Sequence, residues 1–344
     1  MELPYCSVII PVRDGQGFIA ECLEQLIAQT YPADKLEILV IDGMSSDGTR
    51  RVVEEVRKNS VFHVIKIIDN PKGQRASALN IGVKVSKGNV IIRIDARTII
   101  PKDYIEKCIE TLLKTRADNV GGMQVPLVNH NGDCRNEWAQ RAVGIALSHP
   151  FGVGNAQFRL GRQSGFVDTV YLGCFKREIF EQVGYFDEDA PVISEDSDMN
   201  YRIRKAGGKV YFNKDIVAYY YPRDNFRDLA RLYFRYGGAK AGNFLKIKNF
   251  TAWRQLVPPL FLCSIIILGL ASFLSLWARI AFISILGTYL LLDLFVSLGL
   301  ALKEKQFALF HRLVIVFPTL HFPWAIGFFT RLVQRPGQGT YWGY

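Results

Sequence analysis

The chain has 344 residues, enough for one large domain or two smaller ones. Its 42 lysines and arginines exceed its 32 acidic residues, and the formal charge of +10 predicts an anionic partner: nucleic acid, a phosphorylated substrate or a membrane surface. The N-terminal half has no dense basic block with interleaved aromatic residues, which makes nucleic acid the weakest of the three. The six cysteines are scattered without a C-x-x-C pair, which argues against zinc and against a disulfide framework.

The first hundred residues alternate between predicted strands and helices. Apolar runs predict strands at 6–11, 36–41, 62–68 and 90–94. Helices are predicted at 17–29, 50–58 and 76–85. This rhythm predicts an α/β fold, a parallel sheet with helices on its faces. Neither G-x-G-x-x-G after the first strand nor G-x-x-x-x-G-K-[ST] occurs, so NAD binding and P-loop chemistry are not expected.

Three of these strands lead into an acidic residue. Asp14 follows the first strand, Asp42 ends the second, and Asp95 follows the β-branched run at 90–94. Ligands of open α/β sheets bind outside the carboxyl ends of the strands, where these acids are expected to lie. Any one of them could cap a helix or fill a turn. Three acids along one sheet edge favour a nucleotide or metal pocket.

Beyond residue 118 the pattern changes. Strands are predicted at 120–128 and 167–174, and helices at 137–148 and 176–183. The segment 150–165 has four glycines and two arginines. Such a segment is typical of a lid or a binding loop, and an idle surface loop is the alternative.

A further helix is predicted to begin at Ser194-Glu195-Asp196 and to end at residues 207–208. Ser194 is a natural N-cap, and acids in a first turn are favoured by the helix dipole, so capping is the simplest interpretation. The same dipole is expected to lower the pKa of Glu195 and of Asp196. Either would then be a weak base at rest, which suffices for a base that accepts a proton only as the new bond forms.

The C-terminal part of the chain predicts membrane association. Residues 226–255 interleave basic with aromatic and aliphatic side chains, as in a segment on an anionic membrane surface; an ordinary packed helix is the alternative. Residues 256–276 and 280–301 are apolar and long enough to span a bilayer, and 313–329 could span or re-enter. Asp293 lies inside the second span, where an internal hydrogen bond, for example to a hydroxyl on a neighbouring span, is favoured slightly over a ligand contact.

The orientation follows from the flanking segments. Met1 leads into the first strand without a basic n-region and an apolar h-region, so the N-terminal domain is expected to stay in the cytoplasm. Lys303 and Lys305 then also lie inside, as the positive-inside rule prefers. The predicted organisation is a multi-pass protein of the cell membrane. Its parts are a cytoplasmic domain at 1–225, an amphipathic interface segment at 226–255, a transmembrane region of two to three helices at 256–334 and a tail at 335–344.

Six motifs, in this order and spacing, resemble the inverting family 2 glycosyltransferases. They are SVIIPVRD, VIDGMSSDGT, a G-x-x-x-x-A-x-N segment with Gly73, Ala78 and Asn80, RIDAR, GYFDE and SED. The resemblance covers about residues 5–225 and implies the GT-A fold, a mixed, mainly parallel sheet flanked by helices. The apolar C-terminal segments and the sequence HPFGVGNAQFR are similar to the membrane-anchored subgroup typified by the succinoglycan chain-elongation glucosyltransferase.

The resemblance implies roles for single residues. Pro11, Arg13 and Asp14 would line the nucleotide pocket, and Asp42 matches the position that meets the uracil ring. Asp95 matches the first acid of the metal-binding D-x-D, which implies Mg²⁺ or Mn²⁺ as cofactor. Asp196, with Glu195 beside it, matches the general base. Candidates for phosphate contacts are Lys72, Arg75, Arg159 and Arg162.

Two residues depart from the family pattern. Gly43 stands where many members have a second acid, which weakens the expectation that the site recognises a uracil ring. Arg97 stands where the second acid of the D-x-D is usual. The cation would have one carboxylate fewer there, or Arg97 would itself neutralise part of the diphosphate charge.

The leading functional hypothesis is transfer of a sugar from a nucleotide donor, UDP-hexose above all, to a lipid-linked saccharide at the cytoplasmic membrane face. The product would serve polysaccharide or glycan assembly. A close alternative transfers the sugar directly to polyprenyl phosphate. An alternative of a different class is a non-catalytic, nucleotide-binding membrane scaffold in which Arg97 marks a decayed metal site.

Overall fold

The computed structural model describes residues 2–60, 64–128, 134–189, 195–248, 250 and 252–334. The predicted cap Ser194 and the predicted tail 335–344 lie outside these ranges. The chain forms two compact units, one of Met1–Leu127 and Ala156–Tyr221 and the other of Val128–Asn155 and Pro222–Tyr344. The sequence places one boundary near residue 225, whereas the structure also assigns 128–155 to the second unit, because the helix in this segment packs on the C-terminal helices.

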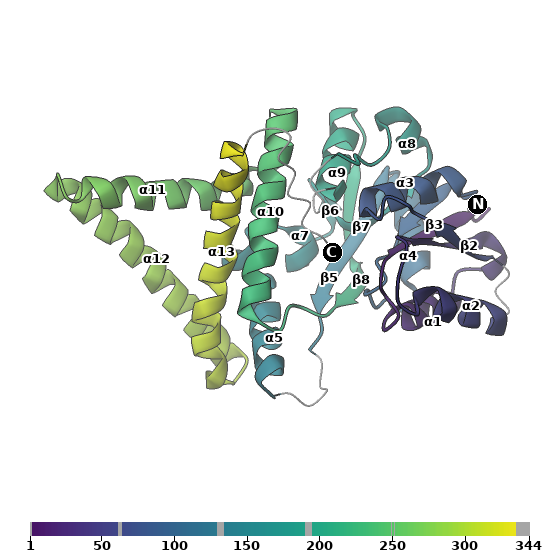
Figure 1. The fold of residues 1–344 in the computed structure, drawn as a ribbon, viewed down its shortest axis with the longest axis horizontal. Coiled ribbons are helices and arrows are strands. Elements are labelled where there is room, and N and C mark those ends of the chain that lie inside the picture. Colours follow the sequence, from purple (N-terminus) through teal and green to yellow (C-terminus); the bar gives the residue numbers. More distant parts are fainter. Residues whose placement is uncertain are drawn as a thin grey trace. The chain divides into compact units, whose positions relative to one another are not determined.

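Within the described residues, the first unit is built on an eight-stranded sheet with the order β3-β2-β1-β4-β7-β5-β8-β6 (Figure 1). The strands are β1 Cys6–Val12, β2 Leu36–Asp42, β3 Ile65–Asp69, β4 Val90–Arg93, β5 Asn119–Pro126, β6 Gly165–Phe166, β7 Tyr171–Lys176 and β8 Val210–Tyr220. Strands β1 to β4 run parallel to one another, and β7 pairs antiparallel with both β4 and β5. The predicted mixed, mainly parallel sheet with flanking helices is confirmed.

The alternation of side chains along the strands gives two apolar layers. One layer packs β1, β2 and β4 against α1 Ile19–Ile27, α2 Thr49–Asn59 and α4 Tyr104–Thr115. The other packs the opposite side chains of these strands against α3 Arg75–Val85, α8 Glu178–Val183 and α9 Glu195–Lys205. Figure 1 shows α1 and α2 on one side of the sheet and α3, α8 and α9 on the other. Both faces are buried, which is why the strands read as continuous β-branched runs.

Strand β8 is not among the sequence predictions. Its residues VYFNKDIVAYY contain a polar Asn-Lys-Asp interruption, and its pairing with β5 shifts register between Gly121 and Met123. A Cβ atom at Gly122 would lie 1.9 Å from the carbonyl oxygen of Ile216, so the irregular strand requires glycine at that point. The bulge breaks the apolar alternation from which a strand is recognised.

The second unit is helical in its described part. Its helices are α5 Cys134–Leu147, α6 Pro150–Val153, α10 Phe226–Ile247, α11 Val257–Ala271, α12 Leu276–Lys303 and α13 Phe310–Val333. Three helical segments there are long and apolar enough to cross a membrane: Arg254–Ala271, Leu276–Lys303 and Phe307–Val333. The third segment forms a continuous helix even though Pro318 and Pro323 lie inside it. The predicted C-terminal apolar helices are confirmed.

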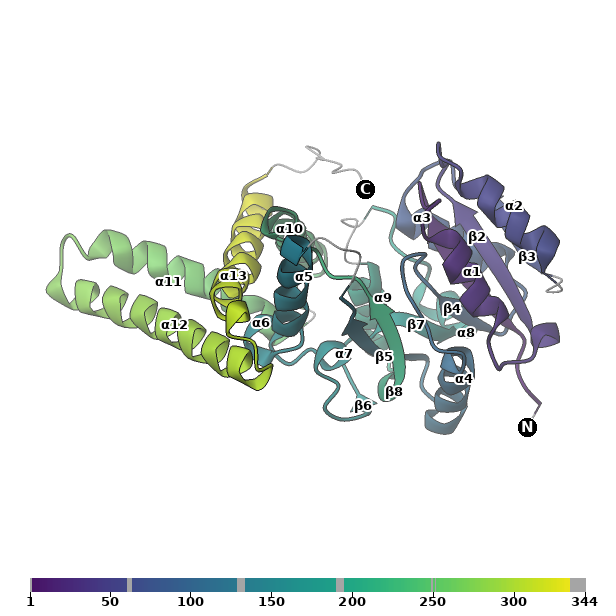
Figure 2. The ribbon, with the colours of Figure 1, turned by 90° about the horizontal axis from the view of Figure 1, so that it is seen from below.

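Helices α10 and α13 lie side by side in both views (Figures 1 and 2). Their backbones touch at two glycines: a Cβ atom at Gly237 would lie 1.8 Å from the carbonyl oxygen of Trp324, and one at Gly327 would lie 2.0 Å from that of Phe234. The buried Asp293 of α12 accepts a hydrogen bond from Ser297 at 3.1 Å. The internal hydrogen bond that the sequence analysis favours is therefore present, and its hydroxyl lies one turn further along the same helix rather than on a neighbouring span.

The glycine-rich segment 150–165 contains two short helices, α6 in the second unit and α7 Gln157–Leu160 in the first. Phe151 of α6 packs edge-on against the rings of Phe317 and His321. Nε2 of His321 donates to the carbonyl oxygen of Phe151 at 2.8 Å, so Nδ1 accepts from the hydroxyl of Tyr289 at 2.9 Å. The beginning of the segment is therefore held within the helical unit.

Candidate active site

The carboxyl ends of four parallel strands meet at one sheet edge. Val12 of β1 is in register with Asp42 of β2, and Asp42 with Asp69 of β3. Asp95 lies two residues beyond the end of β4. Asp14, Asp42 and Asp95 therefore share the edge at which the sequence analysis expects them, and Asp69 adds a fourth acid that it did not single out. Pro11 lies one residue before the end of β1, opposite Ile41.

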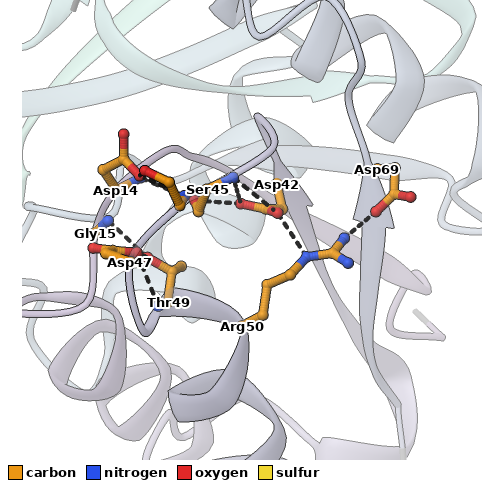
Figure 3. Close-up of polar contacts among 9 residues, drawn as sticks. Asp14, Gly15, Asp42, Ser45, Asp47, Thr49, Arg50 and Asp69 are labelled. Carbon is orange, nitrogen blue, oxygen red and sulfur yellow. Dashed lines mark hydrogen bonds and ion pairs between the residues drawn. The ribbon is translucent and has the colours of Figure 1, made fainter.

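The loops after β1 and β2 are joined by hydrogen bonds around Asp14 (Figure 3). The backbone N–H of Asp14 donates to the Ser45 hydroxyl at 2.9 Å, and the backbone N–H of Ser46 donates to the Asp14 carboxylate at 2.8 Å. The next N–H, of Gly15, donates to the Thr49 hydroxyl at 2.8 Å. Asp14 thus fixes the shape of the loop that follows Asp42.

Asp42 is the buried member of a chain of three charged side chains (Figure 3). It is 1% exposed and accepts from the Ser45 hydroxyl at 2.5 Å and from Nε of Arg50 at 2.7 Å. The same guanidinium pairs with Asp69, which is 59% exposed. The oxygens of Asp42 therefore already accept protein donors, and Arg50 and Asp69 are the exposed end of the chain.

Arg13 lies between two glycines. A Cβ atom at Gly73, whose φ is +64°, would lie 2.8 Å from Nη1 of Arg13, and one at Gly43 would lie 3.1 Å from its Cβ atom. The space at both positions is thus limited by the arginine side chain. This packing gives a physical reason for the absence of a second acid at Gly43.

Hydrogen bonds join two of the sequence motifs. Asn80 of α3 donates through Nδ2 to the carbonyl oxygen of Phe186 and to the Glu188 carboxylate, both at 2.8 Å, and accepts from the Phe186 N–H at 2.9 Å. Glu188 in turn accepts from Lys72 at 2.7 Å. The G-x-x-x-x-A-x-N and GYFDE motifs therefore form one brace, and Lys72, a candidate for a phosphate contact, is part of it.

The centre of the site is Arg93, a residue that the sequence analysis did not single out. It is the last residue of β4, and its side chain is 3% exposed. Nε and Nη2 donate to the two carboxylate oxygens of Asp95, at 2.9 and 3.2 Å. Nη1 donates to Asp196, and Nη2 lies 3.4 Å from Oε1 of Glu195. A charged residue between isoleucines in a doubly covered strand is the signal that could have identified it.

Arg75, at the start of α3, completes this cluster. Its Nη1 donates to Oε1 of Glu195 at 3.2 Å. Asp95, Glu195 and Asp196 thus converge on two guanidinium groups, although Asp95 follows β4 and the other two acids open α9. We refer to these five residues as the arginine–carboxylate cluster. The structure brings together four residues that the sequence analysis assigned to the site, and adds Arg93.

Within the cluster, the pKa values of Asp95 and Asp196 are shifted in opposite directions. Burial opposes the ionisation of Asp95, but the charges of Arg93 and Arg75 outweigh it and lower the pKa of Asp95 below its ordinary value. For Asp196, burial is the largest effect and raises the pKa to about 7; Arg93 opposes the rise, and the negative charges of Glu195 and Asp95 add to it. The sequence analysis expects the helix dipole to lower the pKa of Asp196. That expectation is wrong, because burial among other acids dominates.

The other predicted cations lie in different surroundings. Arg97 is exposed, and its guanidinium lies 4.4 Å from the centre of the Phe18 ring. Arg159 of α7 lies 5.1 Å from the ring of Tyr220 and donates to its hydroxyl. Arg162 is exposed. The contacts of Arg97 and Arg159 are made with aromatic side chains outside the arginine–carboxylate cluster.

The described residues contain no group of three or more His, Cys, Asp and Glu side chains arranged to hold a metal ion. Asp95 offers one carboxylate, and when Asp196 is ionised the three acids of the cluster exceed its two arginines by one charge. Mg²⁺ in nucleotide-dependent enzymes is commonly held by one or two carboxylates together with substrate phosphates. The residues present therefore fit a divalent cation that takes most of its remaining ligands from a diphosphate.

Comparison with known proteins identifies the family. The model of glycosyl transferase family 2 matches residues 7–184, which include the strand-end acids and end at Gly184, the first residue of the GYFDE motif. The chain belongs to glycosyl transferase family 2. Membership of this family identifies the protein as an enzyme, a glycosyltransferase. The alternative hypothesis of a non-catalytic, nucleotide-binding scaffold is therefore not retained.

Two curated relatives extend the similarity beyond the family domain. Dolichyl N-acetyl-α-D-glucosaminyl phosphate 3-β-D-2,3-diacetamido-2,3-dideoxy-β-D-glucuronosyltransferase of Methanococcus voltae is 27% identical over 98% of this chain and 99% of its own length. Succinoglycan biosynthesis protein ExoA of Rhizobium meliloti is 30% identical over 73% of each chain. The expected resemblance to the succinoglycan subgroup is confirmed.

A solved structure supports the fold. Mannosyltransferase PcManGT from Pyrobaculum calidifontis, in complex with GDP-Man and Mn²⁺, superposes with a TM-score of 0.61 at 19% identity. The match covers 97% of this chain and 88% of that one. The glycosyltransferase therefore has the GT-A fold followed by apolar helices.

Proposed function

We propose that this glycosyltransferase moves a sugar from a nucleoside diphosphate donor, UDP-hexose, to a lipid-linked saccharide at the cytoplasmic membrane face, in glycan or polysaccharide assembly. The observation that carries the proposal is the meeting of Asp95 and Asp196 on Arg93 at the carboxyl edge of the sheet. In this proposal, Asp95 holds a divalent cation at the donor diphosphate, and Asp196 accepts the proton of the acceptor hydroxyl.

The donor nucleotide is assigned to the edge formed by the ends of β1, β2 and β3. Arg13 and Pro11 line it, and Asp14 holds its loop. Because the Asp42 oxygens already accept from Ser45 and Arg50, base recognition is assigned to Asp42, Arg50 and Asp69 as a unit. GDP-sugars belong in the donor test beside UDP-sugars, since the structurally similar mannosyltransferase was solved with GDP-Man.

The proposed reaction is a single displacement. The acceptor oxygen attacks the anomeric carbon, the bond from this carbon to the diphosphate oxygen breaks, and the hydroxyl proton passes to Asp196. Inversion follows, so an α-linked donor gives a β-linked product. A pKa of about 7 suits Asp196 as a base, because the best catalytic base has a pKa near the working pH.

The leaving diphosphate gathers negative charge, and Arg75 is the proposed cationic side chain nearest to it in the cluster. Asp95, kept ionised by Arg93 and Arg75, is the proposed ligand of Mg²⁺ or Mn²⁺. When bound, the divalent cation supplies Lewis-acid stabilisation of the leaving group. Arg97 stays a candidate for a further diphosphate contact.

The lipid acceptor is supported by the relatives and by the apolar helices. The relative from Methanococcus voltae is named for a dolichyl N-acetylglucosaminyl phosphate acceptor and aligns over almost the whole chain. A long lipid is most accessible to an enzyme with three helices that can cross the bilayer, beside the basic helix α10 proposed to lie at its surface. Direct transfer to polyprenyl phosphate is the second candidate, supported by the same helices.

The test is a donor panel. Membranes that contain the full chain are incubated with UDP- and GDP-sugars and with polyprenyl phosphate or its saccharide-linked forms. The masses of the lipid products are then measured by mass spectrometry. A mass gain of one hexose on a lipid that already carries a sugar supports the proposal. A product with one sugar on polyprenyl phosphate selects the second candidate, and no transfer from any donor contradicts both.

A further inference from the structure

Arg93 has an unusual position for a charged side chain. Arg93 lies two residues after Ile91, so both side chains point to the same face of β4. Ile91 packs there in the apolar layer formed with α3, α8 and α9. Both faces of β4 are buried, and an ionised group there is costly unless it is paired. All three of its acidic partners lie outside β4, at the beginning of α9 and just beyond the strand end.

All three nitrogen atoms of the Arg93 guanidinium group face carboxylate oxygens. Nε and Nη2 face Asp95, Nη1 faces Asp196, and Nη2 also approaches Glu195. A planar guanidinium fixes the direction of each of these bonds, which an ammonium group does not. Arg93 therefore contacts both Asp95 and Asp196, although 101 residues separate the two acids in the sequence.

The charge of Arg93 also bears on cation binding. Asp95 is the single carboxylate proposed to hold a divalent ion, and both of its oxygens accept from Arg93. A cation that approaches Asp95 alone meets a carboxylate that is already neutralised and meets a nearby positive charge. A cation that arrives with a diphosphate gains the phosphate oxygens as ligands and offsets that repulsion.

We propose that Arg93 is a positioning residue that aligns Asp95 with Asp196 and makes divalent cation binding depend on the donor diphosphate. This inference rests on the proposed function for the roles of the two acids. It assigns a function to a residue outside the motif acids. It also offers a reason why a chain with Arg97 in place of a second acid can still hold a cation: the site is completed by the donor.

The first test measures Mn²⁺ binding, independently of transfer, by the loss of the free Mn²⁺ signal in electron paramagnetic resonance. The purified full chain is titrated with and without UDP. In the wild type, UDP is expected to tighten Mn²⁺ binding at least about tenfold. Arg93→Met removes one positive charge next to Asp95, and Mn²⁺ without UDP is then expected to bind at least about tenfold more tightly than to the wild type. Equal Mn²⁺ affinity of the two proteins without UDP would overturn the proposal.

The second test separates charge from geometry and does not depend on the folding of the Met variant. Arg93→Lys keeps the charge and loses the fork, so Mn²⁺ affinity without UDP is expected to stay close to wild type. The turnover number is expected to fall about 100-fold with little change in the KM for the donor, because a misplaced reacting group costs about that factor. A Lys variant with wild-type turnover contradicts the positioning role.

Arg177→Met is the matched control. Arg177 is a partly buried arginine of the same unit, and it donates to the carbonyl oxygens of Gly88, Val83 and Ser86. Its loss is expected to lower the melting temperature without a change in Mn²⁺ affinity. If the wild type binds Mn²⁺ and UDP as described but transfers no sugar, the proposed function fails while the role of Arg93 in cation binding stands.

Discussion

Arg93 at the end of β4 donates directly to Asp196 in the first turn of α9, across 103 residues of sequence. This contact joins the strand end that carries Asp95 to the helix that carries the proposed base. In the proposed mechanism, the departure of the diphosphate and the removal of the acceptor proton thus depend on groups held by one guanidinium.

Asp196→Asn tests the base. The amide keeps the shape of the side chain but cannot take up the acceptor proton, so the turnover number is expected to fall about 100- to 10,000-fold, the usual contribution of a general base. Donor binding, measured by calorimetry with UDP, is expected to persist. Asp198→Asn is the control on the same helix, since Asp198 pairs with Arg202 at 2.8 Å. Full activity of Asp196→Asn would remove the proposed base.

The pH profile follows from the raised pKa of Asp196, for which burial is the main cause. Below this pKa the carboxyl is protonated and cannot act as a base; above it the carboxylate is free to accept a proton. The ratio kcat/KM is therefore expected to rise with pH around an apparent pKa of about 7 and then to level off. A profile without any change through neutral pH contradicts this assignment.

Asn80→Ala tests the brace between the two motifs. The variant leaves the N–H and the carbonyl group of Phe186 without their side-chain partner. A loss of about 1–3 kcal/mol in the free energy of unfolding is expected, since buried groups lose their hydrogen bonds. Thermal unfolding of the purified protein measures it. Asn89→Ala, at an exposed position nine residues further along the chain, is the control, and equal stability of the two variants would show that the brace contributes little.

Gly327→Ala tests the contact of α13 with α10. The new Cβ atom would lie 2.0 Å from the carbonyl oxygen of Phe234, so the helices must separate, and a loss of about 1–3 kcal/mol is expected from overpacking. Gly299→Ala in α12 is the matched control, because nothing lies within 4 Å of its added Cβ atom. Melting temperatures in detergent compare the two. A Gly327→Ala protein as stable as Gly299→Ala would contradict the close packing.

The sequence predicts the parallel part of the sheet and its acidic edge because buried strands read as unbroken apolar runs. Asp14, Asp42 and Asp95 are found at this edge for that reason. Strand β8 is missed because its bulge places Asn-Lys-Asp inside the run. The pKa of Asp196 is misjudged because a helix dipole is a local property, whereas burial among Asp95, Glu195 and two arginines arises only from the tertiary fold.

The role of Arg93 could not be assigned from the sequence for a related reason. A single arginine in an apolar strand requires an acidic partner, but the sequence does not say that this partner comes from a helix a hundred residues later. The grouping of 128–155 with the C-terminal helices is equally non-local, since it depends on the packing of α5 against α13.

The anomeric configuration of the product tests the central proposal most directly. A donor with an α-linked sugar is supplied to the full chain in membranes, and the linkage of the isolated lipid product is read from the coupling constant of its anomeric proton. A single displacement at a site with one base, Asp196, predicts a β-linked product. An α-linked product would contradict it.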